Sequence, residues 1–323
     1  MDSSMKNINY MSKWIPFILI GAFILVLFIM PLLFRSPNQT PSATTEDLPS
    51  SEKKCEINIK ISGEDLPITL EDYLVGVVAA EMPADFHPEA LKAQAIAART
   101  YVLQTTNYGQ SEIEPTVARQ VYYDQTIRQN NWQSAFLENE QKIREAVKST
   151  EGEVIVYNDE LITAMFHSMS NGMTESAKNY SGNDLPYLQP VASTDFQYAT
   201  NYEATKTLTI NEWNQKLGVN WTIGAVKQLK LKRNDTGRVD TVSLQNKVWT
   251  GREFRELLDL RSTDFSIDVN GETIIVTTEG NGHGVGMSQY GADAMAKQGS
   301  TAHQILNHYY KNTKIEKISC SWK

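Results

Sequence analysis

The chain has 323 residues, which is enough for one large domain or two ordinary ones. Hydrophobic residues make up 41% of it and charged residues 21%, the composition of a globular protein and not of a disordered or repetitive one. The formal net charge is −8, and no cluster of lysines and arginines compensates for it. This balance argues against nucleic acid as a partner.

The first segment predicts a membrane anchor. Residues 15–33 carry no charge, and about 20 apolar residues suffice to span a bilayer. Lys6 and Lys13 precede this run and favour a cytoplasmic N-terminus. A cleaved signal peptide is the alternative, but it should have a shorter apolar region ending at a small-residue site, which residues 30–35 lack.

The sequence therefore predicts four regions. We expect a cytoplasmic tail over residues 1–13, a transmembrane anchor over 14–34, a flexible linker over 35–53, and an extracytoplasmic domain over 54–323. The linker is rich in Pro, Ser and Thr and lacks apolar periodicity, as a tether does.

The two cysteines, Cys55 and Cys320, lie at opposite ends of the outer region, each in a short strand-like segment. An oxidising compartment permits a disulfide between them, and two unpaired thiols fit the sequence equally well. Neither cysteine has the spacing of a metal ligand, and no histidine pair has the HExxH spacing. We expect no metal and no cofactor.

The outer region begins with helical patterns. Thr69 is a helix cap followed by acids, and this helix should end near Glu81, before Pro83. Pro88 starts a second helix that reaches about Thr105, and residues 134–149 form a third amphipathic candidate.

Strand patterns dominate further along. A hairpin is expected over 153–157 and 161–166 around Asn158-Asp159-Glu160, and a polar loop follows over 167–174. Further strands are expected at 226–232, 238–245, 265–269 and 273–278, with helices from Thr250 to Leu260, at 287–297 and at 301–310, before a last strand. The fold class is α+β, with a helical part near 68–150 and a sheet-rich remainder.

Glu81 is the candidate catalytic residue. It ends an almost wholly apolar run, and a desolvated carboxyl retains its proton, as the general acid of a glycosidase must. Lys92 and Arg99 lie seven positions apart on one face of the next helix, where apolar and small residues surround them. A helix-end carboxylate that merely pairs with one of these cations is the alternative.

A glycine-rich segment, Gly280–Ala292, follows a strand and opens a helix. Its glycines fit neither the phosphate-loop nor the dinucleotide pattern, so they point instead to a tight turn with close backbone approach. His283, Ser288, Gln289 and Tyr290 offer hydrogen-bonding groups suited to sugar hydroxyls and acetamides. A turn that only packs against the core is the alternative. The nucleophile elbow of a serine hydrolase is absent from the sequence.

The chain resembles the stage II sporulation protein D (SpoIID) family. The resemblance rests on five segments in the family's order: AAEMP at 79–83, EALKAQAIAARTY at 89–101, FHSMSNGMTESA at 166–177, PYLQPV at 186–191 and GHGVGMSQYGA at 282–292. They span most of residues 56–320.

The resemblance implies a peptidoglycan lytic transglycosylase that acts during forespore engulfment. Such enzymes cleave the MurNAc–GlcNAc bond of peptide-stripped glycan strands without water and leave 1,6-anhydroMurNAc ends. It implies Glu81 as the catalytic residue, with Lys92, Arg99, Tyr187, His283, Ser288, Gln289 and Tyr290 assigned to the substrate. Some relatives bind zinc through cysteines after the His-Ser pair, but residues 167–172 contain no thiol.

The resemblance also implies partners and a location. The partners are glycan strands, a SpoIIP-type amidase and a SpoIIM-type membrane protein. The location is the mother-cell engulfing membrane, with a single span and the C-terminal domain outside the cytoplasm, facing the forespore. A non-catalytic, glycan-binding amidase enhancer is the rival function, because proteins that share this domain occur in that role.

Overall fold

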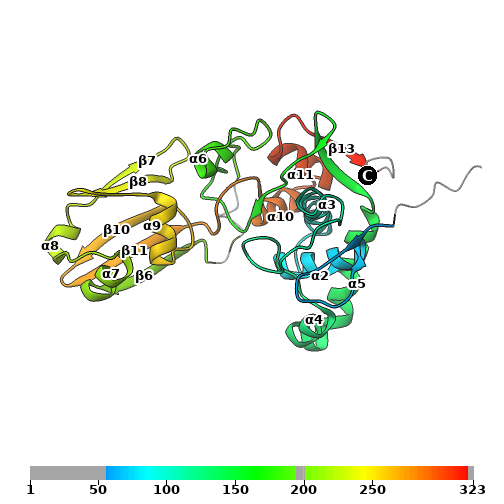
Figure 1. Cartoon of the computed structure of the whole chain (residues 1–323), viewed down its shortest axis with the longest axis horizontal. Coiled ribbons are helices and arrows are strands. Elements are labelled where there is room, and N and C mark those ends of the chain that lie inside the picture. The colour runs from blue at the N-terminus through cyan, green and yellow to red at the C-terminus, as the bar shows by residue number, and fades with distance from the viewer. Residues whose placement is uncertain (1–55, 194–198, 200, 319–323) are drawn as a thin grey trace, which may run out of the picture. The chain divides into compact units, whose positions relative to one another are not determined.

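The computed structural model describes residues 56–193, 199 and 201–318 (Figure 1). These residues belong to one compact unit, Lys54–Lys323. The predicted tail, anchor and linker, together with Cys55 and Cys320, lie outside the described residues. No helix within the described residues is long and apolar enough to cross a membrane.

Helix α3 (Pro88–Thr105) is the centre of the helical part. The side chains of Ala93, Ala95, Ala97 and Ala98 are wholly buried, and such small residues let neighbouring helices approach closely. Helices α2 (Leu70–Glu81), α5 (Phe136–Ser149), α10 (Gln289–Lys297) and α11 (Ala302–Tyr309) all pack against it. The expected helix starts are confirmed, since Thr69 caps α2 and Pro88 opens α3.

The C-terminal part of the chain returns to this helical core. Figure 1 shows α10 and α11 beside α3, although nearly 200 residues separate them in sequence. Strand β12 (Met287–Ser288) pairs in parallel with β5 (Phe166–His167), and β13 (Lys314–Lys317) pairs with β3 (Glu153–Tyr157), which also pairs with β4 (Glu160–Leu161). The expected hairpin turn is confirmed, because Asn158 and Asp159 both have positive φ.

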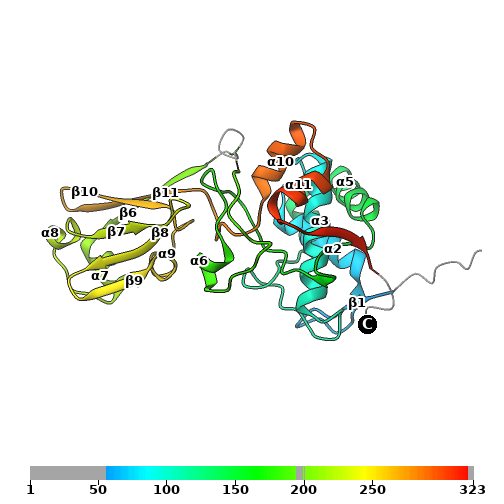
Figure 2. The same cartoon turned by 90° about the horizontal axis from the view of Figure 1, so that it is seen from above.

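The sheet-rich part has its own hydrophobic core, built from residues between Leu208 and Val276. Its two antiparallel sheets have the strand orders β10-β11-β6 and β7-β8-β9. Figure 2 shows them as separate layers, and α7 (Ile210–Leu217) and α9 (Gly251–Leu258) pack on them through Trp213 and Phe254. The strands are β6 (Glu203–Thr209), β7 (Lys230–Arg233), β8 (Val239–Leu244), β9 (Lys247–Thr250), β10 (Phe265–Asn270) and β11 (Thr273–Glu279).

The α+β class is confirmed, but the predicted division of the chain was wrong in detail. The helical part is not limited to residues 68–150, because α10 and α11 complete its core and the sheet-rich part is inserted before them. This return could not be predicted, since helix amphipathicity indicates which face of a helix is buried but not which element covers that face.

Several elements also differ from expectation. Residues 223–226 form a short helix, α8, where a strand was expected to begin, and β7 starts only at Lys230. Of the strand expected over 161–166, only the two end residues lie in strands, Leu161 in β4 and Phe166 in β5. Strand β1 (Asn58–Ile59) lies in the strand-like segment expected after Cys55. The elements that were not predicted are β2 (Ile68–Thr69), α4 (Gln125–Trp132), a 3-10 turn (Gln133–Ala135), α6 (Ala177–Ser181), α7, β6 and β9.

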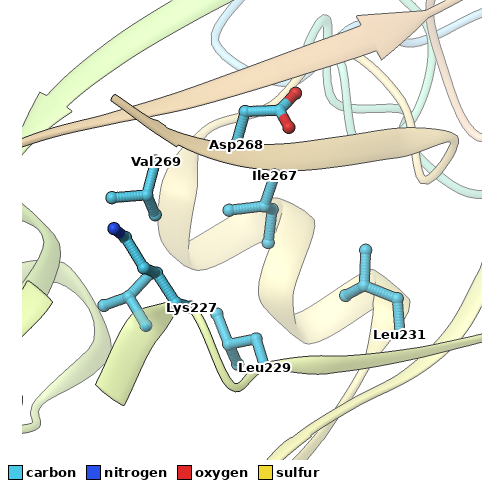
Figure 3. Close-up of a pocket in the computed structure, with 7 residues that line it drawn as sticks. Lys227, Leu229, Leu231, Ile267, Asp268 and Val269 are labelled. Carbon is cyan, nitrogen blue, oxygen red and sulfur yellow. The ribbon is translucent and has the colours of Figure 1, made fainter. Parts of the chain in front are cut away.

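A cavity of about 360 Å³ lies in the sheet-rich part. Aliphatic side chains from α8, β7 and β10 line it, with Lys227 and Asp268 as its charged residues (Figure 3). Its lining contains none of the predicted site residues.

Candidate active site

Glu81 is the last residue of α2, and the helix ends there because Pro83 follows and Met82 is extended. The residues before it are buried, so its carboxyl lies at the edge of the core and is itself partly buried. The Val121 N–H donates to Glu81 Oε1 at 3.3 Å, and the side-chain amide of Gln289 also hydrogen-bonds the carboxylate.

The surroundings of Glu81 contain one influence that favours its protonated form and two that favour its ionised form. Burial raises the pKa of Glu81, while the hydrogen bonds from the Val121 backbone and the Gln289 side chain act in the opposite direction. The net effect is a raised pKa. No ion pair involves Glu81 among the described residues. A carboxyl in this setting holds a proton and can still ionise, as a group that serves as acid and then as base must.

The segment that carries Val121 lies across α2. Tyr123 N–H donates to the Gly76 carbonyl at 3.1 Å, and the Tyr122 ring stacks on Tyr73 with centroids 5.5 Å apart. A Cβ on Gly76 would overlap the Tyr122 ring and the Tyr123 carbonyl. The glycine in α2 therefore permits the close approach that brings the Val121 amide to Glu81.

Gln289 reaches Glu81 from the start of α10. Ser288 caps that helix, since its hydroxyl accepts from the Gly291 N–H at 3.2 Å. Gln289 Nε2 also donates to Oε1 of Gln94 on α3 at 3.4 Å, and Gln94 is wholly buried. The Nε2 atom of Gln94 has no hydrogen-bond partner in the part of the chain that the structure describes. Three helices, α2, α3 and α10, thus meet around one carboxyl.

Tyr290, the residue after Gln289, lines a polar cavity of about 640 Å³. Its ring packs edge-on against Phe86, with centroids 4.9 Å apart, and Phe86 lies five residues after Glu81 in the chain. The cavity lining is Ser168, Met169, Asn201, Glu203, Ala204, Arg261, Asn281 and Tyr290. An aromatic ring beside amide, hydroxyl and charged groups suits a saccharide, which presents apolar ring faces and many hydroxyls.

Arg99 does not lie beside Glu81. Its wholly buried guanidinium pairs with Glu71 at 2.6 Å and donates to the carbonyls of Val147 and Glu153. Glu71 and Glu81 lie ten positions apart on α2, and this separation is about 15 Å along a helix. Arg99 therefore ties α3 to α2 and α5 at the far end of α2, and no surface of it is open to a substrate.

Lys92 is also occupied elsewhere. Its ammonium pairs with Glu89 at 2.7 Å, one turn earlier on α3, and the other oxygen of Glu89 accepts from the Ala302 N–H. These contacts attach α3 to the start of α11. Gln94, and neither cation, is the α3 residue whose hydrogen bond leads to Glu81 through Gln289.

The remaining predicted residues fall into two groups. Tyr187 is buried, and its hydroxyl accepts from the Thr163 N–H, so it belongs to the core. Ser288 is wholly buried as the α10 cap. His283 is partly buried, and burial, with the nearby arginine charges adding to it, lowers its pKa to about 4. The structure therefore places the Gln289 amide on Glu81, with Tyr290 next to Gln289 in α10, while the contacts described for Lys92, Arg99, Tyr187 and Ser288 lie elsewhere in the fold.

Sequence reasoning missed Gln94 and the Val121 amide. Gln94 had a detectable signal, because an amide inside the apolar run Ala90–Ala98 requires a buried partner. The backbone donor at residue 121 had none, since it depends on how a loop crosses α2. The described residues contain no group of three or more His, Cys, Asp or Glu that could hold a metal ion.

Comparison with known proteins places the chain in a family. Residues 66–157 match the SpoIID family, described as Stage II sporulation protein. Stage II sporulation protein D of Bacillus subtilis (strain 168) is 44% identical over 256 residues, covering 77% of this chain and 74% of that protein. Its counterpart from Bacillus amyloliquefaciens is 38% identical over 333 aligned residues, covering 94% and 96%.

A more distant relative has a different name. The amidase enhancer of Bacillus subtilis (strain 168) is 28% identical over 296 residues, which cover 75% of this chain and 40% of that protein. With the sporulation proteins matched over most of their length, the chain belongs to the stage II sporulation protein D family, as its five motifs predicted.

Proposed function

We propose that the protein is a peptidoglycan lytic transglycosylase. It cleaves MurNAc–GlcNAc bonds in peptide-stripped glycan strands and leaves 1,6-anhydroMurNAc ends during forespore engulfment. The observation that carries this proposal is the environment of Glu81: a partly buried carboxyl with a raised pKa, two hydrogen-bond donors and no ion pair among the described residues.

One carboxyl suffices for this reaction. Protonated Glu81 donates its proton to the glycosidic oxygen as the bond to C1 of the muramoyl residue breaks. The C6 hydroxyl of the same residue then bonds to C1, and the Glu81 carboxylate takes the hydroxyl proton. Acid and base are thereby restored, and no water is consumed. An ordinary glycosidase needs a second carboxylate, whereas reactions in which the substrate supplies its own nucleophile do not.

The hydrogen bonds around Glu81 fit both halves of this cycle. Burial keeps the proton on the acid before cleavage, and the Val121 and Gln289 donors stabilise the carboxylate that forms after it. Because Gln94 holds Gln289, the carboxylate meets a donor that is already in place. The polar cavity beside Tyr290 receives the neighbouring saccharides.

A binding module that enhances an amidase is the second candidate. The amidase enhancer among the relatives favours it, although at only 28% identity. In that case the polar cavity beside Tyr290 would hold glycan without cleavage.

We further propose the setting of the reaction. Residues 14–34 would anchor the protein once in the mother-cell engulfing membrane, with residues 54–323 outside the cytoplasm, facing the forespore. A SpoIIP-type amidase would supply the stripped strands, and a SpoIIM-type membrane protein would complete the assembly. The relatives named as sporulation proteins support this setting.

Mass spectrometry of the products tests the activity. Peptide-free glycan strands are incubated with residues 54–323 as wild type, Glu81→Gln and Glu89→Gln. The last variant is the matched control, because Glu89 is a carboxylate of the same helical region that pairs with Lys92 away from the site. We expect anhydro-ended fragments from the wild type and the control, and none from Glu81→Gln.

Other results would redirect the proposal. Fragments with ordinary reducing ends would mean hydrolysis and require a second carboxylate. Wild-type protein that binds glycan and stimulates an amidase without cutting would establish the enhancer.

A further inference from the structure

The sheet-rich part has an open side, where the aliphatic cavity of Figure 3 lies. Strand β10 is the edge of one sheet and β7 is the edge of the other, since each pairs with a single neighbour among the described strands. Both strands and α8 contribute the aliphatic lining, which consists of Val226, Leu229, Leu231, Ile267 and Val269. We call this cavity, together with the free edge of β10, the edge groove.

The backbone of β10 has hydrogen-bonding groups that face this edge. The Glu279 N–H donates to the Asp264 carbonyl at 2.9 Å, and β10 and β11 continue from there in one unbroken register. In an antiparallel pair, the backbone groups of a strand face its partner only at every second residue. Those of Ile267 and Val269 therefore face away from β11, toward the free edge.

One end of the groove is closed by a side chain. The Arg233 guanidinium on β7 donates to the Phe265 carbonyl of β10 at 2.8 Å, which confirms that the odd-numbered residues of β10 face this edge. Beyond that bond, no hydrogen bond of the described residues joins β7 to β10. The N–H and C=O groups of Ile267 and Val269 are thus open to pairing with another strand.

The side chains of the groove suit an extended peptide. Figure 3 shows the side chains of Ile267 and Val269 on one side of β10 and the carboxyl of Asp268 on the other, as the alternation of a strand requires. A peptide strand added to β10 would form main-chain hydrogen bonds with it, and every second side chain of the peptide would enter the cavity. The aliphatic lining favours apolar side chains at those positions.

The side of the groove formed by α8 and β7 is positively charged. Lys227 lines the groove and Lys230 begins β7; both are exposed, and neither has an ion pair among the described residues. The next two cations on β7 pair with aspartates. Acidic residues of a bound peptide would complement the two unpaired lysines.

A second copy of the chain suits this edge less well than an acidic peptide does. A symmetric contact through β10 would bring Lys227 and Lys230 of both copies into one interface, where like charges repel. Lysines beside a sheet edge commonly prevent such self-association. They do not oppose an acidic strand.

We propose that the edge groove binds an extended acidic segment of a partner protein. The segment adds as a strand to β10, inserts aliphatic side chains at alternate positions into the cavity, and carries acidic residues that reach Lys227 and Lys230. The inference is independent of the proposed function, because the lining of the groove contains no predicted site residue.

Binding of a labelled peptide to the full chain, measured by fluorescence anisotropy, tests the inference. The probe is a peptide of about eight residues in which valine alternates with glutamate. One comparison peptide has lysine in place of glutamate, and another has the valines and glutamates in two separate blocks. We expect both to bind about tenfold more weakly than the probe, or not at all. Hydrogen exchange should slow at the Ile267 and Val269 amides in the complex, because those N–H groups become paired.

Two variants separate the backbone from the charges. Ile267→Pro removes an N–H that the ladder with β11 does not use, so the sheet is retained while strand addition is blocked. Lys227→Glu with Lys230→Glu reverses the charge and keeps the edge. We expect each variant to weaken probe binding about tenfold or more. Lys247→Glu is the control, because Lys247 is exposed on β9, at the opposite edge of the sheet that contains β7.

Four results would overturn the inference. The acidic probe does not bind; the lysine peptide binds as well as the probe; the folded Ile267→Pro variant binds the probe as tightly as the wild type, so that the lysines attract any polyanion; or the chain forms dimers through β10 that exclude the probe. If Ile267→Pro does not fold, the lysine variant and the hydrogen exchange of the wild type decide the outcome.

Discussion

Glu81 is held between a burial that favours its proton and two donors that favour its charge. The apolar run before it made the burial predictable from sequence, because a carboxyl at the end of a buried helix must leave water. The two hydrogen-bond donors were harder to predict from the sequence. Gln289 lay in a recognisable motif, but its bond to Glu81 depends on helices that are some 200 residues apart in sequence.

Gln94 should act as a positioning residue. In Gln94→Leu, the Gln289 amide loses its support and stabilises the Glu81 carboxylate less, so the pKa of Glu81 rises further above its ordinary value. The acid form then persists to higher pH. We therefore expect the alkaline limb of the pH profile of kcat/KM, measured on glycan oligomers, to shift to higher pH.

Gln141→Leu is the control, because that glutamine is exposed on α5 and, among the residues that the structure describes, its side chain hydrogen-bonds Glu145. A rate reduced equally at every pH, without movement of the limb, would show that Gln94 supports the fold and does not position the acid.

At the scale of elements, α2 and α3 are joined by the ion pair between the buried Arg99 and the partly exposed Glu71, and Glu81 lies at the other end of α2. Sequence spacing correctly placed Lys92 and Arg99 on a mostly buried helix, and it correctly required an acceptor for each cation. It could not choose among carboxylates, because Glu71, Glu81 and Glu89 all lie on neighbouring helical segments. The packing decides that choice.

Arg99→Met should therefore reduce stability and not substrate affinity. Removing the wholly buried guanidinium breaks its pair with Glu71, whose side chain is 30% exposed, at a cost of about 2 kcal/mol, and it also leaves the carbonyls of Val147 and Glu153 without their donor. Thermal unfolding should show this loss, with KM unchanged at temperatures where the variant is folded.

Lys92→Met is the comparison, since its partly exposed pair with Glu89 contributes less than about 1 kcal/mol. A raised KM for Arg99→Met without loss of stability would instead support the substrate role first assigned to it.

On the scale of the whole molecule, the chain forms a helical core, leaves it for the sheet-rich part, and returns through α10 and α11. Most long elements were predictable, because capping residues, prolines and alternation fix them locally. The return of the chain to the helical core was not predictable, because it depends on long-range contacts that place β12 beside β5 and Gln289 beside Glu81. The candidate site exists only because of it.

The membrane anchor is the prediction that concerns the chain as a whole. We expect the full chain to sediment with membranes and to resist extraction by salt or alkaline carbonate, because an uncharged run of this length inserts in the bilayer. Deletion of residues 14–34 should release it into the soluble fraction. Release of the undeleted chain by alkaline carbonate would contradict an uncleaved anchor.

The most direct test of the account is cleavage of peptide-free glycan in water labelled with heavy oxygen, followed by mass spectrometry of the new ends. If Glu81 works alone and the C6 hydroxyl attacks C1, the wild-type products carry no label and are lighter than hydrolysis products by one water. Heavy oxygen at C1 of the new ends would contradict the account, because water would then be the nucleophile.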